Sequence, residues 1–174
     1  MSSRADRPAR SAATADPADV AAEQRLAERV VNGMLGRDAF SAWLGVELLD
    51  VRPRAAAVRM AVRPDMVNGF GVCHGGVTFA LADSALAFAS NTHGRVTVSI
   101  ENSITYPAPA AVGDVLTAIA VEESAGRRVA FYGVRVTKQD DSLVALFRGT
   151  VYRTGRDHFA QDPKDEGENV AADA

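Results

Sequence analysis

The sequence contains few of the residues that disulfide, metal or membrane proteins require. Cys73 is the only cysteine, so an internal disulfide cannot form and a zinc site with four cysteine ligands is excluded. No apolar run approaches the about 18 residues that cross a bilayer, and no apolar leader opens the chain. The net charge of -3 argues against a basic surface for nucleic acid. These absences predict a soluble, cytoplasmic protein with no nucleic-acid or membrane partner.

Motifs of several large enzyme classes are also missing. The sequence has no phosphate-binding G-x-x-x-x-G-K-[ST], no dinucleotide-binding G-x-G-x-x-G, no zinc-binding H-E-x-x-H and no G-x-S-x-G of serine hydrolases. His74, His93 and His158 are not spaced as metal ligands. We therefore expect a protein without a metal or nucleotide cofactor.

The composition separates a central domain from two polar ends. Overall, 47% of the 174 residues are hydrophobic and 24% are charged, as in ordinary globular proteins. Residues 1–17 contain no large apolar residue except Met1, and residues 155–174 contain six acidic residues against two basic ones. Such segments bury too little apolar surface to offset the entropy of ordering. The sequence predicts disordered tails at 1–17 and 155–174 around one domain, 18–154.

Hydrophobic patterning inside this domain predicts an α+β fold. Helical spacing predicts a helix from Asp19 to Gly36, with a further turn at Phe40–Leu44, and the almost wholly apolar segment Gly75–Asn91 is typical of a helix buried on most sides. Two strands are expected between Val46 and Val62, and four more at Val96–Tyr106, Val115–Glu123, Arg128–Thr137 and Leu143–Tyr152. Residues 63–74 read as a loop. The economical arrangement is a largely antiparallel sheet curved around the one buried helix.

Asp83 is the single charged residue in the apolar stretch Val77–Ser90. A carboxylate is rarely buried without a partner, and desolvation raises its pKa. Two interpretations stay open. Either Asp83 lies on a narrow solvent-facing edge or is held by hydrogen bonds, or it is an acid, base or nucleophile that faces a pocket.

The entry to the same helix carries His74-Gly75-Gly76. Two glycines at a helix N-terminus leave backbone N–H groups open to a ligand, and the helix dipole favours negative charge there, as in an oxyanion hole. The alternative is that the glycines only permit a tight turn, with His74 an ordinary loop residue. Cys73 beside His74 resembles a nucleophile–base pair, but neighbours in an extended segment tend to point in opposite directions.

The spacing of Gly75 and Asp83 constrains any site that uses both. Eight residues of helix place them about 12 Å apart along the axis, so a carboxylate at Asp83 cannot reach a carbonyl held at the N-terminus of its own helix. Two antiparallel copies of the helix about a two-fold axis would bring Asp83 of one chain towards Gly75 of the partner subunit. A site that includes both residues is therefore predicted to be shared between subunits.

Several segments together resemble a known family. The stretch from Asn68 to Gly76 (N-G-F-G-V-C-H-G-G), followed by Leu81-Ala82-Asp83, is similar to the hotdog-fold acyl-CoA thioesterases of the phenylacetate pathway, the PaaI type. The similarity continues through Tyr106–Asp114 and the last strand, and covers about residues 45–154. Ala108 departs from the arginine that the family often has there.

The resemblance implies a hotdog fold, with a curved antiparallel sheet around a long central helix and here an extra N-terminal helix. It implies that Asp83 is nucleophile or general base, that the Gly75 N–H polarises the thioester carbonyl, that His74 orients the thioester and that Asn68 positions the reacting groups. Gly76, Phe70, Tyr106 and Arg148 are the expected substrate-binding residues. Family members form dimers with shared sites that pair into tetramers, and they need no cofactor beyond the coenzyme A of the substrate.

The expected substrate is (hydroxy)phenylacetyl-CoA or a related aryl or short-to-medium acyl-CoA. Phe79 and Phe88 are further candidates for the acyl pocket, although Phe88 fits the core better. Two other functions stay open: a hotdog enoyl-CoA hydratase, which would need an Asp–His pair in one site, and an acyl-CoA-binding module without activity. The second is disfavoured because a binder gains nothing from a buried unpaired charge.

Overall fold

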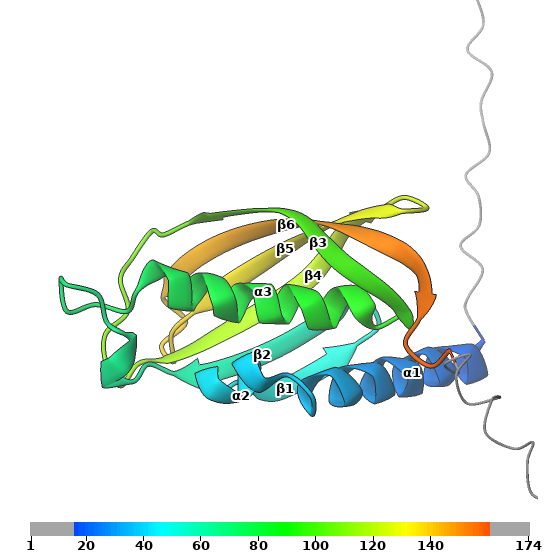
Figure 1. Ribbon diagram of the computed structural model, residues 1–174, viewed down its shortest axis with the longest axis horizontal. Helices are drawn as coiled ribbons and strands as arrows, with labels where there is room; N and C mark the ends of the chain where they lie inside the picture. The colour runs from blue at the N-terminus through cyan, green and yellow to red at the C-terminus, as the bar shows by residue number, and fades with distance from the viewer. Residues whose placement is uncertain (1–15, 161–174) are drawn as a thin grey trace, which may run out of the picture.

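A strongly curved antiparallel sheet wraps around one apolar helix in the computed structural model, which describes residues 16–160 (Figure 1). The helices are α1 (Pro17–Leu35), α2 (Ala39–Leu44) and α3 (Gly75–Asn91), with a 3₁₀ turn, η1 (Pro64–Met66). The strands are β1 (Glu47–Arg52), β2 (Ala55–Ala61), β3 (Arg95–Thr105), β4 (Val115–Ala125), β5 (Val129–Thr137) and β6 (Leu143–Asp157). The α+β hotdog architecture predicted from the sequence is confirmed, including the extra N-terminal helix.

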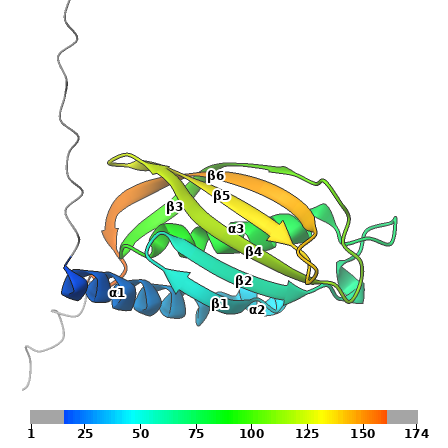
Figure 2. The same ribbon diagram turned by 180° about the vertical axis from the view of Figure 1, so that it is seen from behind.

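The order of the strands leaves β3 at one edge of the sheet. The order is β1-β2-β4-β5-β6-β3, and every neighbouring pair is antiparallel. Strand β3 follows α3 in the chain but crosses to the far side of β6. Helix α1 lies alongside β1 at the opposite edge, where Gln24 Nε2 donates to the Val51 carbonyl at 2.8 Å (Figures 1 and 2).

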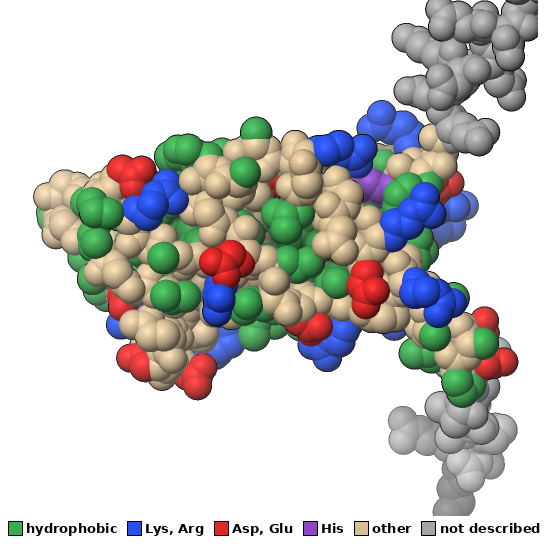
Figure 3. Space-filling view, turned by 90° about the horizontal axis from the view of Figure 1, so that it is seen from below, with side chains coloured by type: hydrophobic (Ala, Val, Ile, Leu, Met, Phe, Trp, Pro, Cys, Tyr) green, Lys and Arg blue, Asp and Glu red, His purple; other side chains and the backbone are tan. Residues whose placement is uncertain are grey.

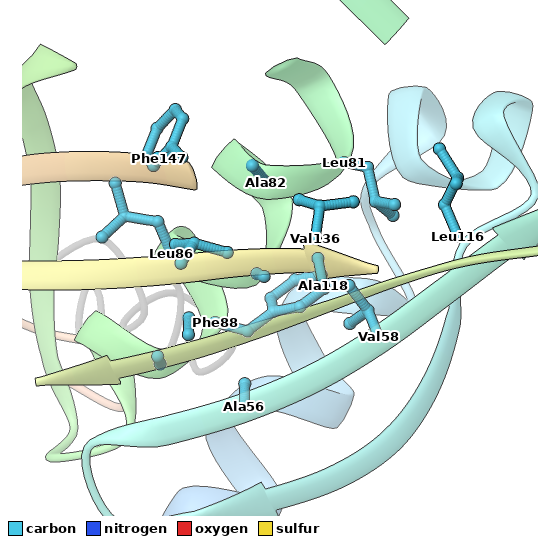
Figure 4. Packing of buried hydrophobic residues seen from close by; sticks show 14 of the residues in the cluster. Ala56, Val58, Leu81, Ala82, Leu86, Phe88, Leu116, Ala118, Val136 and Phe147 are labelled. Atoms are coloured by element: carbon cyan, nitrogen blue, oxygen red, sulfur yellow. The ribbon is translucent and has the colours of Figure 1, made fainter. Parts of the chain in front are cut away.

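The core lies between α3 and the concave face of the sheet (Figure 4). Leu81, Ala82 and Ala85 of α3 are completely buried, and so are Val58 and Leu116 of the sheet. The small alanines let the strands approach the helix closely, while Leu86 and Phe88 fill the wider spaces. This burial of apolar area, worth about 25 cal/mol per Å², explains why α3 is apolar on nearly every side.

Two elements extend into the segments that the sequence predicts as tails. Helix α1 begins at Pro17 because Asp16 Oδ1 accepts a hydrogen bond from the Ala18 N–H at 2.9 Å and caps the first turn. Strand β6 continues to Asp157, past the expected end of the domain at residue 154, because Arg95 at the start of β3 pairs with Asp157. The rest of the two predicted tails, residues 1–15 and 161–174, lies outside the described residues. No helix within residues 16–160 is long and apolar enough to span a membrane.

Candidate active site

The loop before α3 is shaped by Asn68. Its Oδ1 accepts hydrogen bonds from the N–H groups of Phe70 at 2.9 Å and Val72 at 3.4 Å, and its own N–H donates to the Val72 carbonyl at 2.8 Å. Gly71 completes the turn with a φ of +77°, which L residues rarely adopt. Phe70, at the tip, is 92% exposed. Asn68 therefore fixes the loop that leads into α3, and the ring of Phe70 is left almost wholly exposed.

His74 caps the N-terminus of α3. Its Nδ1 accepts a hydrogen bond from the Gly76 N–H at 2.9 Å, so the ring proton of the neutral imidazole lies on Nε2, on an exposed ring. The Gly75 N–H has no acceptor among the described residues. The two backbone N–H groups that the sequence suggests as oxyanion donors therefore differ in their hydrogen bonding. Gly76 donates to His74, and Gly75 is left for a ligand.

Tyr106 lies directly against Gly75. Its hydroxyl donates to the Gly75 carbonyl at 2.9 Å, and a Cβ at Gly75 would lie only 3.2 Å from Tyr106 Cζ. A cavity of about 320 Å³ adjoins them and is also lined by Asn68, Cys73 and Thr78. The structure therefore brings together four of the predicted residues, Asn68, His74, Gly75 and Tyr106, at one end of α3.

Cys73 forms no nucleophile–base pair with His74. Its Sγ lies 3.7 Å from Thr78 Oγ1, whereas the imidazole of His74 is directed to the Gly76 N–H. Burial raises the pKa of the Cys73 thiol, which disfavours the reactive thiolate. Within residues 16–160, no group of three or more His, Cys, Asp or Glu side chains is arranged to hold a metal ion.

Asp83 lies half-buried in the middle of α3, held by an asparagine of the edge strand. Asn102 Nδ2 donates to Asp83 Oδ1 at 3.0 Å, and Asn102 Oδ1 in turn accepts from Ser99 Oγ at 2.8 Å. Burial raises the pKa of Asp83 above its ordinary value, and the hydrogen bond from Asn102 opposes that rise. The result is a fixed, partly desolvated carboxylate, which is a stronger base than an exposed one.

Asn102 is the residue of the candidate site that the sequence does not predict. Its signal is weak: one amide between Ile100 and Ile104 in a strand of mixed composition. It reaches Asp83 because it faces α3 opposite Gly149, the residue of β6 with which it pairs. A Cβ at Gly149 would lie 2.9 Å from Asn102 Oδ1, so glycine makes room for the amide.

The remaining candidates do not join Asp83 or Gly75. Phe88 is 1% exposed and belongs to the core, and the ring of Phe79 packs edge-on against Phe147 at 5.2 Å. Arg148 is exposed on the convex face, because its neighbours on β6, Phe147 and Gly149, are buried on the side of α3. Within one chain the structure does not bring Arg148 to the candidate site.

Comparisons with known proteins identify the family of the chain. The family model described as the thioesterase superfamily matches residues 70–145. A putative esterase from Archaeoglobus fulgidus is 39% identical over 137 residues, covering 79% of this chain and 89% of that protein. The acyl-coenzyme A thioesterase PaaI of Escherichia coli is 36% identical over 124 residues, covering 71% of this chain and 89% of the relative.

Solved structures of similar fold come from the same family. The structure of the E. coli PaaI protein has a TM-score of 0.76 and 34% identity, and the match covers 77% of this chain and 97% of that chain. A hypothetical thioesterase from Streptococcus pneumoniae TIGR4, solved with coenzyme A, has a TM-score of 0.62 and 27% identity, covering 64% of this chain and 90% of that chain.

Proposed function

Because the chain belongs to the thioesterase superfamily, among its PaaI-like members, we propose that it hydrolyses acyl-CoA thioesters. The observation that carries this proposal is the pair of groups on α3. A half-buried carboxylate, Asp83, is held by Asn102, and the Gly75 N–H is left without an acceptor among the described residues. A base or nucleophile and an oxyanion donor are the two groups that acyl transfer needs.

The site is proposed to form between two copies of the chain. Asp83 and Gly75 are about 12 Å apart along α3, so one copy cannot apply both to one carbonyl. Strand β3 has a free edge, and its Val98 and Ile100 are 45% and 57% exposed. An edge of this kind favours pairing with another strand. Antiparallel pairing of two β3 strands would set the α3 helices side by side and antiparallel, with Asp83 directed towards Gly75 of the partner subunit.

A second exposed apolar surface supports the assembly of dimers into a tetramer. It lies on the convex face of the sheet, where four large side chains are 43–48% exposed: Ile119, Val121, Phe131 and Leu146. Scattered apolar residues on a surface are common, but a contiguous patch of them indicates an interface. Arg148 borders this surface, so its predicted contact with substrate would have to be made across that interface.

The proposed reaction adds water across the C–S bond of the thioester. The Gly75 N–H donates to the carbonyl oxygen, and His74, with Nδ1 held by Gly76, presents its Nε2–H to orient the thioester. Asp83 of the other subunit can act in two ways. As a general base it removes a proton from the attacking water, the C–S bond breaks, and the proton passes to the departing CoA thiolate; as a nucleophile it attacks the carbonyl carbon and expels the CoA thiolate, and water then hydrolyses the mixed anhydride to release the acid and supply the proton of the thiol. A preorganised donor of this kind is worth about 3–4 kcal/mol in the transition state.

The acyl group is proposed to lie in the cavity beside Gly75 and Tyr106. Its volume of about 320 Å³ and the ring of Tyr106 suit an aryl or short-to-medium acyl chain. Phenylacetyl-CoA and its hydroxylated relatives are the first substrates to test. Gly76 and Phe70 would border the entrance, Phe70 from the exposed loop tip.

Release of thiol from a panel of acyl-CoAs tests the activity. We expect Asp83→Asn, which keeps the shape of the side chain, to lower kcat by at least about 100-fold while the protein stays folded. Asp19→Asn, an exposed residue of α1, is the matched control and should leave the rate unchanged. An Asp83→Asn enzyme within a few-fold of wild type, or hydration of crotonyl-CoA without thiol release, would contradict the proposal.

A mixing experiment tests the sharing of the site. Gly75→Pro removes the N–H at the first helical position, where proline is tolerated, and Gly75→Ala is the control that adds a Cβ but keeps the N–H. If each site combines two chains, an equilibrated mixture of Asp83→Asn and Gly75→Pro regains about a quarter of wild-type activity, since half the dimers have one intact site. An inactive mixture that contains heterodimers would place the whole site within one chain.

A further inference from the structure

A cavity of about 610 Å³ lies at the opposite end of α3 from Gly75, and half of the residues that line it are arginines. Arg95 comes from the start of β3, Arg127 and Arg128 from the turn between β4 and β5, and Arg153 from β6. Its other lining residues are His93, Tyr152, Thr154 and Gly155. Figure 3 shows Lys and Arg side chains gathered at this end of the molecule, beside a histidine.

The positive charge of this cavity is only partly neutralised. Arg153 pairs with Glu122 at 2.8 Å, and Arg128 donates to the Tyr152 hydroxyl at 3.1 Å. Within residues 16–160, the guanidinium groups of Arg95 and Arg127 have neither a hydrogen bond nor an ion pair, and no acidic residue lines the cavity. Like charges gathered in one cavity repel each other, so the arrangement favours an anionic ligand.

The chemistry of the wall indicates the class of anion. A guanidinium group matches two oxygens of a phosphate with two parallel N–H donors, which makes arginine the preferred residue for phosphate recognition. The volume lies within the range of cavities that hold small molecules, and Tyr152 adds an aromatic ring to the wall. A phosphorylated nucleotide satisfies both features better than a small inorganic anion does.

The position of the cavity relates it to the carboxylate. His93 follows α3 ten residues after Asp83, which is about 15 Å along the helix axis. Strand β3 begins in the cavity with Arg95 and reaches Asn102, beside Asp83, seven residues later, which is about 23 Å of extended chain. An extended pantetheine arm with its diphosphate spans about 20 Å by ordinary bond lengths. The cavity therefore lies at the distance from Asp83 that the nucleotide of an acyl-CoA would reach.

Given the proposed thioesterase function, we infer that the cavity of Arg95, Arg127, Arg128 and Arg153 binds the phosphate groups of the CoA nucleotide while the thioester lies at Asp83. Arg153, fixed by Glu122 and by a hydrogen bond to the Gly126 carbonyl at 3.2 Å, forms the rigid wall. Arg95 and Arg127 are exposed, and their guanidinium groups, which have no partner within residues 16–160, bind the phosphates.

Steady-state kinetics with two thioesters of the same acyl group test this inference. We expect Arg127→Ala and Arg95→Ala each to raise KM for the acyl-CoA about tenfold, with little change in kcat, since a hydrogen bond to a charged group is lost. The same variants should hydrolyse the acyl-pantetheine, which lacks the nucleotide, at the wild-type rate. Arg25→Ala on α1, an exposed arginine outside the cavity, makes the same change of charge and should alter neither KM.

The outcomes separate this inference from the proposed function. Wild-type hydrolysis of both thioesters with an unchanged acyl-CoA KM in the arginine variants overturns the inference and leaves the thioesterase in place. If no thioester is hydrolysed, the proposed function fails, and calorimetry with adenosine 3′,5′-bisphosphate still tests the cavity. Binding that Arg127→Ala weakens about tenfold supports a nucleotide site, and absence of binding contradicts it. Inorganic phosphate that binds the cavity without competing with acyl-CoA also overturns the inference.

Discussion

Gly149 on β6 leaves space for two side chains: Leu86, which packs in the core, and Asn102, which contacts Asp83. A Cβ built there would approach Leu86 Cδ2 more closely than side-chain carbons do and would lie 2.9 Å from Asn102 Oδ1. Leu86 is 1% exposed and packed on all sides, so it can yield only by leaving its rotamer. Overpacking of this kind costs about 1–3 kcal/mol. For a domain of this size we expect Gly149→Ala to lower Tm by about 3–10 °C.

Thermal unfolding followed by circular dichroism measures the effect, with Gly155→Ala as the control. Gly155 lies on the same strand, but a Cβ there meets nothing within 4 Å, so alanine should leave Tm unchanged or raise it slightly by reducing the entropy of the unfolded chain. Equal Tm values for the two variants would refute the packing argument. Displacement of Asn102 should also lower kcat for thioester hydrolysis. A reduced Tm with an unchanged kcat would show that Asn102 does not hold the reacting carboxylate.

Two further changes test the groups at the middle and the start of α3. Asn102→Leu removes the hydrogen bond that lowers the pKa of Asp83, while burial still raises it, so the pKa of Asp83 rises further. Activity falls at low pH as the carboxylate is protonated, and this acidic limb of the kcat/KM profile should therefore move to higher pH. An acidic limb that does not move would contradict the role of Asn102. His74→Ala removes the cap on the Gly76 N–H and should cost about 1 kcal/mol in unfolding free energy. Its loss of hydrolysis should be smaller than that of Asp83→Asn and shared between kcat and KM; a loss as large as that of Asp83→Asn would assign His74 to the chemistry itself.

The fold could be predicted from the sequence because its main determinant is local. The apolar run Gly75–Asn91 is too long for a strand and too uniform for a surface helix, and the strand segments follow it in an order that permits antiparallel pairing. Asp83 could also be identified from the local sequence, because a single charged residue in an apolar helix is rarely buried without a partner or a function. The open N–H of Gly75 could also be predicted from the short segment His74-Gly75-Gly76, whereas the hydrogen bond from the Gly76 N–H to His74 could not.

Asn102 could not be predicted, because a β-bulge decides which way it faces. Thr97 is buried, so strict alternation would direct Asn102 away from α3. The register of β3 against β6 shifts between Ser99 and Glu101, which turns Asn102 and Ile104 towards the helix instead. A change of one residue in register exchanges the two faces of a strand, and no residue type in the sequence marks this position.

The arginine cavity could not be predicted from the sequence either, because it depends on the tertiary arrangement of the strands. Arg95, Arg127 and Arg153 are far apart in the chain, and only the neighbouring positions of β3, β6 and the turn between β4 and β5 bring them together. The charge of the described domain gives no hint either, because acidic residues elsewhere balance these arginines. The cavity is a product of sheet topology and not of a local motif.

Strand β3 connects all of these features, and this has a consequence for assembly. Its first residue, Arg95, lines the basic cavity; its bulge turns Asn102 to Asp83; and its free edge is the surface on which a second copy is proposed to pair. Because β6 is the only strand that pairs with β3 within residues 16–160, the position of Asn102 depends on an edge strand that has a partner on one side only. Pairing with a second copy would fix that edge as well as supply the missing Gly75. A separated subunit should therefore lose activity for two physical reasons: the oxyanion donor is absent, and the strand that holds the carboxylate is less constrained.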